Sequence, residues 1–163
     1  TNMVYSLFLS NKMINQDVVI TYGDVIFHEK IFNHLKVKKD LMPINNNWFK
    51  NWKNRMPLSK VLEDAENLFV KKNNLIEIGT KIDKKKIPNY QFMGILKLKK
   101  KTFFKCYDFF KKLKNNNIDM TSFINLCIKN KIMTLKTVQY KDYWYEIDTI
   151  SDHKYASKDL KKW

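Results

Sequence analysis

The sequence predicts an α/β domain in which a buried strand of a parallel sheet lies between helices. Val18–Ile20 form a continuous apolar run that cannot alternate between core and solvent, and such runs are typical of strands buried on both faces. The run lies between two segments, 1–16 and 28–38, whose apolar residues recur at helical spacing. A length of 163 residues with 44% hydrophobic residues fits a single domain, 1–163, with a substantial core.

The first predicted strand stops at Gly23, and Asp24 follows at its carboxyl end. In open α/β sheets, ligands bind outside the carboxyl ends of the strands. Asp24 is therefore a residue of a metal or phosphate site, or a turn residue that hydrogen-bonds its own backbone. The segment alone leaves both interpretations open.

The next segments predict a short strand and a helix. Leu41–Asn45 is apolar but contains Pro43, which predicts a strand at a sheet edge or in a turn. Trp48 and Trp52 are four residues apart and share one face of a helix. We favour a packing helix over an aromatic wall that places Arg55 near a bound group, because aromatic side chains dominate core burial.

The remaining chain predicts a hairpin, further strands and three helices. The apolar runs 68–70 and 75–78 flank an Asn73-Asn74 turn, which indicates a β-hairpin. Gly94 interrupts the strand 90–98, where a ligand or another backbone segment would approach closely. Helices are predicted at 102–114 and 121–130, strands at 132–140 and 143–148, and a terminal helix capped by Ser151 and Asp152.

The formal charge of +15 would attract phosphate groups, yet it does not indicate a dedicated nucleic-acid surface. Of the 31 basic residues 30 are lysines, which are dispersed along the chain, and Arg55 is the single arginine. No apolar run is long enough to span a membrane and no secretory signal is visible. Cys106 and Cys127 are interpreted as buried hydrophobic residues of a protein in the reducing cytoplasm.

Six short segments, in this order, resemble the second half of the sugar-nucleotidyltransferase-like family. They are VVITYGDVIF (18–27), NNWFKNWKNR (46–55), LEDAENL (62–68), LIEIGTK (75–81), YQFMGILKL (90–98) and WYEIDTISDHKYA (144–156). The similarity is closest to small bacterial members that activate phosphocholine, phosphonates or sugar phosphates. It implies a three-layer Rossmann-like (GT-A-like) α/β fold with a mixed, mostly parallel sheet whose N-terminal part is missing.

The resemblance also implies a reaction and a set of site residues. The reaction is transfer of a nucleoside monophosphate from a nucleoside triphosphate to a phosphorylated acceptor, with release of pyrophosphate and with Mg²⁺ as the cofactor. Carboxylates suit such a hard divalent cation. By position in the family motifs, Asp24 and Asp148 would be catalytic residues and metal ligands, and the acceptor would contact Lys81, Gly94, Glu77 and Trp144.

The sequence also departs from the family, whose N-terminal Gly-rich loop, arginine and lysine for the triphosphate have no counterpart here. The chain is then either the carboxyl-terminal part of a longer parent enzyme or a degenerate relative. The strand that should lie beside Val18–Tyr22 belongs to that segment, so an unprotected sheet edge is expected. The alternatives to an enzyme are a non-catalytic basic α/β module that binds nucleic acid or an anionic partner, and a non-catalytic regulatory remnant that pairs with a complete homologue through this edge. The sequence is also compatible with a homo-oligomer.

Overall fold

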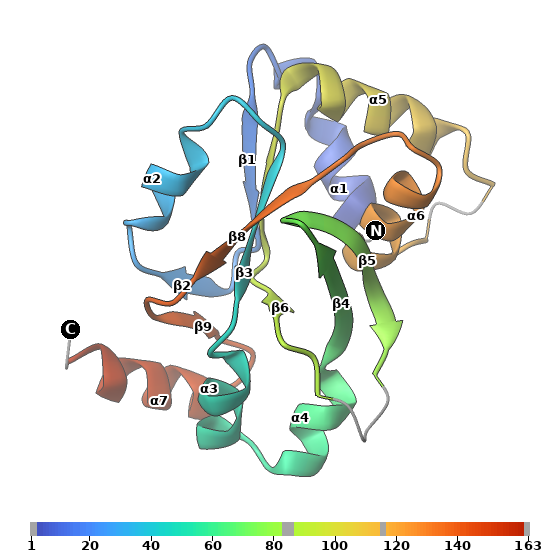
Figure 1. The fold of residues 1–163 in the computed structure, drawn as a ribbon. Coiled ribbons are helices and arrows are strands. Elements are labelled where there is room, and N and C mark those ends of the chain that lie inside the picture. The colour runs from blue at the N-terminus through green and yellow to red at the C-terminus, as the bar shows by residue number, and fades with distance from the viewer. Residues whose placement is uncertain (1–2, 83–86, 115–116, 162–163) are drawn as a thin grey trace.

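A computed structural model describes residues 3–82, 87–114 and 117–161. Its main sheet has the strand order β1-β7-β3-β8-β5-β4 with β6 added beside β3, and β2 pairs with β9 in a separate small sheet (Figure 1). In chain order the elements are α1 (Met3–Leu9), the 3-10 helix η1 (Ser10–Met13), β1 (Val18–Thr21), β2 (Val25–Phe27), α2 (Ile31–Leu35), β3 (Leu41–Asn45), α3 (Trp48–Arg55), α4 (Leu58–Asp64), β4 (Glu66–Lys71), β5 (Asn74–Lys81), β6 (Gln91–Phe92), β7 (Ile95–Leu98), α5 (Lys100–Lys111), α6 (Met120–Lys129), β8 (Lys136–Tyr140), β9 (Trp144–Glu146) and α7 (Ile150–Leu160).

The structure has three layers, because apolar side chains cover both faces of the main sheet. One cluster joins α1, α5 and α6 to the sheet and contains Phe8 and Phe103, which are 3% and 0% exposed. The other cluster joins α2, α3 and α4 to the opposite face and contains Ile31 and Trp48. The predicted three-layer α/β fold is therefore confirmed. None of the described helices is long and apolar enough to cross a membrane.

The sheet is mixed, but the expectation of a mostly parallel sheet is wrong. Among the described strands, β3 and β8 form a parallel pair, with Leu41 opposite Lys136. The other described pairs of the main sheet, including β1 with β7 and β4 with β5, are antiparallel. The predicted hairpin accounts for one of these pairs, since Lys72 and Asn73 adopt the positive φ angles of a tight turn between β4 and β5.

Strand β1 is an edge strand, so the prediction of a strand buried on both faces is wrong. In the main sheet it pairs with β7, and Val18 lies opposite Leu98. Val18 and Ile20 pack against the core, whereas Val19 between them is 43% exposed. The apolar run therefore alternates after all, with an apolar residue on the exposed side. The position of β1 at the end of the sheet agrees with the expected unprotected edge.

Strand β3 is central and fully buried, although Pro43 predicted an edge position. On one side Pro43 lies opposite Val138 of β8. On the other side β3 pairs with β7 at Leu41 and with β6 at Ile44, and no pairing is formed at Pro43. This break in the ladder is compatible with a residue that lacks an amide hydrogen.

One predicted helix end is confirmed and one helix cap lies elsewhere. Asn130 follows the last residue of α6 as its C-cap, with a negative φ, and the left-handed conformation is adopted by the next residue, Lys131. Helix α7 begins with a capping box in which Thr149 is the N-cap and Asp152 the third helical residue. The predicted cap at Ser151 is therefore wrong, because the Thr149 side chain accepts the hydrogen bond from the backbone amide of Asp152.

Candidate functional site

The structure places Asp24 beside the segment that carries Glu146 and Asp148. Asp24 lies in the turn between β1 and β2, and β2 pairs with β9 so that Val25 is opposite Glu146. The backbone amide of Ile147 donates a hydrogen bond of 2.9 Å to the carbonyl oxygen of Asp24. Both Asp24 and Asp148 are exposed, which leaves their carboxylates accessible to a ligand.

Arg55, at the end of α3, joins three carboxylates of this region. Its Nη1 atom lies 3.1 Å from Asp152 Oδ1 and 3.7 Å from Asp148 Oδ2, and its Nη2 atom lies 3.2 Å from Glu146 Oε2. The guanidinium also lies over the ring of Trp52, 5.4 Å from its centroid, and the Arg55 side chain is only 4% exposed. The predicted packing role of α3 is correct for its tryptophans, but its arginine orders the acidic segment.

Glu146 is the most strongly perturbed acid of the group. Burial raises its pKa to about 8, Arg55 acts in the opposite direction, and the negative charges of Asp148, Asp24 and Asp152 raise it further. The three aspartates therefore lie within electrostatic range of Glu146, and two of them, Asp148 and Asp152, share the Arg55 guanidinium with it. A cation bound here would relieve their mutual repulsion.

A cavity of about 260 Å³ opens next to Glu146. The elements around it contribute carboxylates, aromatic rings and an amide, and its described lining residues are Met3, Tyr22, Trp52, Asp64, Glu66, Gln91, Phe92, Gly94, Asp119, Met120, Thr121 and Glu146. The Thr121 hydroxyl lies 2.9 Å from Glu66 Oε1 and 3.0 Å from Asp119 Oδ1. Gln91 donates a hydrogen bond of 2.7 Å to the carbonyl oxygen of Glu66. The cavity wall is thus acidic and held by its own hydrogen bonds.

Tyr22 connects this cavity to Asp24. It also lines a neighbouring cavity of about 410 Å³ along the edge of β1, which includes Asp24. Burial raises the pKa of Tyr22 well above its usual range, and the charges of Glu66, Asp119, Glu146 and Asp24 add to the effect. The Tyr22 phenol therefore stays protonated at neutral pH and remains a hydrogen-bond donor where the two cavities adjoin.

Gly94 has a defined steric role at this cavity. It has a φ of +69°, and a Cβ atom there would lie 3.0 Å from the Tyr22 ring. The Tyr22 amide also donates a hydrogen bond of 2.9 Å to the Gly94 carbonyl oxygen. The sequence indicated close approach at Gly94, and the group that approaches in the structure is Tyr22.

The other three predicted acceptor-binding residues lie outside the lining of this cavity. Lys81 ends β5, exposed, with its backbone opposite Glu66. Glu77 forms an ion pair of 3.5 Å with Lys129 on α6. Trp144 is 1% exposed and donates a hydrogen bond of 3.1 Å to the Met93 carbonyl oxygen, so its indole supports the core behind Trp52 instead of facing a ligand.

The comparisons with known proteins agree with this fold. No protein-family model matches the chain. A curated relative, CTP:phosphoglutamine cytidylyltransferase of Campylobacter jejuni, is 28% identical over an alignment 169 positions long, gaps included, which covers 93% of this chain and 66% of the relative. The inositol-1-phosphate CTP transferase of T. maritima superposes with a TM-score of 0.73 at 19% identity over 99% of this chain and 61% of that structure. A Bacillus anthracis structure assigned as a glucose-1-phosphate thymidylyltransferase gives 0.69 at 17% identity, over 99% and 62%.

These similarities support the resemblance of this chain to the sugar-nucleotidyltransferase-like family. The family resemblance expected from the six sequence segments is confirmed, and a non-catalytic nucleic-acid module is not favoured. The chain spans just under two thirds of the length of the curated relative and of these structures.

The carboxylate oxygens of Asp24 and Asp148 are of the kind that suits Mg²⁺, the metal expected from the family resemblance. Magnesium binds through one or two carboxylates and keeps several waters, so the two exposed aspartates supply ligands of the right type. Among the described residues, no group of three or more His, Cys, Asp or Glu side chains is arranged to hold a metal ion.

Sequence reasoning did not identify the residues that organise the site. Glu66 begins β4, whereas Asp119 and Thr121 lie at the start of α6, and nothing in the sequence shows that these two segments meet. Arg55 carried a signal, because a single arginine among 30 lysines marks a position where a planar, bidentate donor is needed.

Proposed function

We propose that this chain is the metal- and acceptor-binding part of a nucleotidyltransferase. The reaction transfers a nucleoside monophosphate from a nucleoside triphosphate to a phosphorylated acceptor and releases pyrophosphate. The observation that carries the proposal is the placement of Asp24 beside Glu146 and Asp148. The curated relative, whose name describes a CTP-dependent transfer to phosphoglutamine, supports this reaction class.

In this proposal Asp24 and Asp148 hold a Mg²⁺ ion. When bound, such a cation offsets negative charge on the phosphate oxygens. Arg55 fixes the neighbouring carboxylates through Glu146 and Asp152, so that Asp148 is presented to solvent in a defined position. Positioning and charge stabilisation are the main contributions that a protein makes to phosphoryl chemistry.

The acidic cavity next to Glu146 is the proposed place for the body of the acceptor. Carboxylates of Glu66 and Asp119 accept hydrogen bonds, while Gln91 and Tyr22 add polar atoms. Such a wall favours an acceptor that is rich in hydroxyl or ammonium groups over an acceptor that carries a second anionic group. Lys81, exposed at the end of β5, is proposed to contact the acceptor phosphate. Trp48 is not available to the acceptor, because it is 1% exposed and donates its indole N–H to the carbonyl oxygen of Pro88.

A metal-binding experiment tests the proposal without requiring turnover. Mn²⁺, a paramagnetic substitute for Mg²⁺, is titrated into the isotope-labelled chain while backbone amide signals are followed by NMR. We expect selective broadening at Asp24 and at 146–148, and its loss in Asp24→Asn and Asp148→Asn. Glu63→Gln, an exposed acid on α4, is the matched control and should broaden like the unchanged chain. Broadening that avoids 24 and 146–148 would contradict the metal site.

An activity assay complements the titration. Pyrophosphate release is measured with CTP, Mg²⁺ and a panel of phosphorylated acceptors that carry hydroxyl or ammonium groups. If the chain turns over, each aspartate variant should lose about 100-fold or more in rate, because metal ligands contribute several kcal/mol to the barrier. Unchanged turnover in both variants would exclude these residues as metal ligands.

We place this activity in the cytoplasm, which fits two buried free cysteines.

A further inference from the structure

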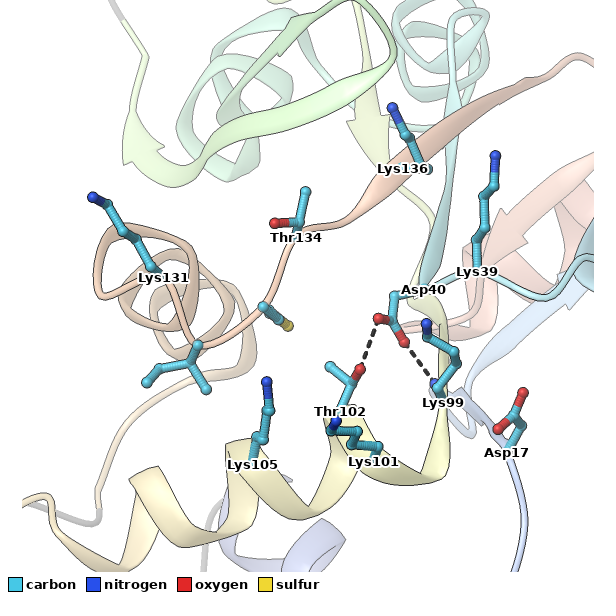
Figure 2. A pocket seen from close by; sticks show the side chains of 12 residues that line it. Asp17, Lys39, Asp40, Lys99, Lys101, Thr102, Lys105, Lys131, Thr134 and Lys136 are labelled. Carbon is cyan, nitrogen blue, oxygen red and sulfur yellow. Dashed lines mark hydrogen bonds between the residues drawn. The ribbon is translucent and has the colours of Figure 1, made fainter.

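A larger cavity, unrelated to the candidate site, is lined mainly by lysines. It measures about 670 Å³ and lies among α5, the residues just before β3 and the segment that leads into β8 (Figure 2). We call it the lysine cavity. Its six lysines are Lys39, Lys99, Lys101, Lys105, Lys131 and Lys136, and two threonines, Thr102 and Thr134, also line it.

The positive charge of the lysine cavity is not neutralised by the two aspartates at its wall. Asp40 accepts hydrogen bonds from the Lys99 amide at 2.6 Å and from the Thr102 hydroxyl at 2.7 Å. Asp17 accepts one from the Lys100 amide at 3.0 Å. Both carboxylates are therefore engaged in capping the start of α5. Within the described part of the chain, none of the six lysines forms an ion pair within 4.0 Å, so their ammonium groups are available to an anion.

The lysine cavity lies at the opposite end of the sheet from Asp24. The parallel strands β3 and β8 begin beside it, at Leu41 and Lys136, and run away from it (Figure 1). Strand β1 likewise begins next to Asp17 at this cavity and leads to Asp24 at its other end. A ligand in the lysine cavity would therefore not occupy the acidic cavity beside Glu146.

The lining of the lysine cavity also indicates the class of ligand. Single-stranded nucleic acids bind on aromatic platforms, but no aromatic side chain is among the described lining residues. Its apolar lining is restricted to Ile132 and Met133. Flexible ammonium groups around a hollow, with the Thr134 hydroxyl beside them, suit several phosphate groups held close together. The volume is in the range of small-molecule sites.

We propose that the lysine cavity binds the oligophosphate group of a small molecule, at a site separate from the acidic cavity. Inorganic pyrophosphate and the phosphate chain of a nucleoside triphosphate share this chemistry. Because the cavity offers no stacking surface for a base, both should bind with similar affinity. A single phosphate should bind more weakly, since it meets fewer lysines at once.

Calorimetric titration of the full chain at low salt, in a chelating buffer without divalent cations, tests the proposal. The probes are inorganic phosphate, pyrophosphate and CTP. Lys101→Gln/Lys105→Gln removes two exposed charges four residues apart on α5 and should weaken pyrophosphate binding about tenfold, because charge-assisted contacts are lost. Lys60→Gln/Lys158→Gln removes the same charge from exposed positions outside the cavity and should change the affinity less than about twofold.

NMR shifts locate the bound probe. Pyrophosphate should shift the amide signals of Thr102 and Thr134, and it should do so equally in Asp24→Asn, which separates this site from the proposed catalytic one. The proposal is overturned by no pyrophosphate binding at low salt, by an equal loss in both lysine double variants, or by shifts confined to the acidic cavity. Binding of CTP but not pyrophosphate, or stronger binding of single-stranded RNA that both double variants weaken equally, would also overturn it.

Discussion

Arg55 and Glu146, 91 residues apart in the chain, are joined by two hydrogen bonds. The guanidinium donates from Nη1 to the Glu146 carbonyl oxygen at 2.8 Å and from Nη2 to the Glu146 carboxylate at 3.2 Å. This fork ties the end of α3 to the end of β9. It thereby fixes the segment that presents Asp148.

Replacing Arg55 should strongly destabilise the protein. Arg55→Lys keeps the charge but cannot form the planar fork, and the largely buried Glu146 carboxylate loses its main partner. We expect a loss of about 3 kcal/mol in the free energy of unfolding, measured by urea denaturation. Lys50→Gln, exposed on the same helix, should stay within about 0.5 kcal/mol. Equal stability of the unchanged chain and Arg55→Lys would show that the fork contributes nothing.

Gly94→Ala should destabilise the fold and narrow the acidic cavity. An added methyl group would meet the Tyr22 ring at 3.0 Å, and alanine is strained at a φ of +69°. The expected cost is about 2 kcal/mol in thermal or urea unfolding. Gly23→Ala is a matched control, because a Cβ atom there has no neighbour within 4 Å. If both variants unfold alike, the close contact with Tyr22 is not the reason for a glycine at position 94.

Asp119 should make stability depend on pH in the acid range. Burial acts to raise the pKa of Asp119, but hydrogen bonds from Ser122 and Thr121 outweigh it and hold the pKa below its ordinary value of 3.8. A carboxyl group with a lowered pKa stabilises the fold fully at pH values above 3.8. This contribution is lost as the pH falls through 3.8 and then through the lower folded value.

Urea unfolding of Asp119→Asn between pH 6 and about pH 3 checks this sign. Asparagine can still cap α6, so the variant should retain most of the cap but lose less stability on acidification than the unchanged chain. Burial and the charge of Asp119 raise the pKa of the neighbouring Glu66, so both proteins are compared in a Glu66→Gln background, which isolates Asp119. A parallel decline of both curves would contradict the assignment.

Trp144→Phe should affect stability without a direct effect on acceptor binding. The substitution leaves the Met93 carbonyl oxygen without its donor in a buried environment and creates a small void. We expect a loss of about 2 kcal/mol in unfolding experiments. Phe69→Leu, an exposed aromatic position, should change stability by less than about 0.5 kcal/mol. Weaker acceptor binding by a stably folded Trp144→Phe would instead support the contact predicted from the family motif.

Local patterns predicted much of the architecture. The β4–β5 hairpin was readable because asparagine tolerates positive φ, although the turn residues are Lys72 and Asn73, one position before the predicted Asn73-Asn74. The helical spacing at 102–114 and 121–130 located α5 and α6 closely. The strand break at Gly94 was also visible. Strand partners were not readable, since an apolar run such as Val18–Ile20 is compatible with a central parallel strand and with an antiparallel edge strand. The edge position predicted from Pro43 was wrong for the same reason, because only the neighbouring strands decide whether a backbone amide hydrogen is needed at that position.

The amino-acid sequence alone predicted the layered α/β fold and the family resemblance, and motif position singled out Asp24 and Asp148. These features depend on local spacing and on residue type. The folded structure was needed to show that Arg55 meets Glu146, that Thr121 lies between Glu66 and Asp119, and that six lysines line one cavity. Such groupings depend on contacts between distant segments, and burial and mutual charge, which perturb the pKa values of Tyr22 and Glu146, exist only after those segments have packed.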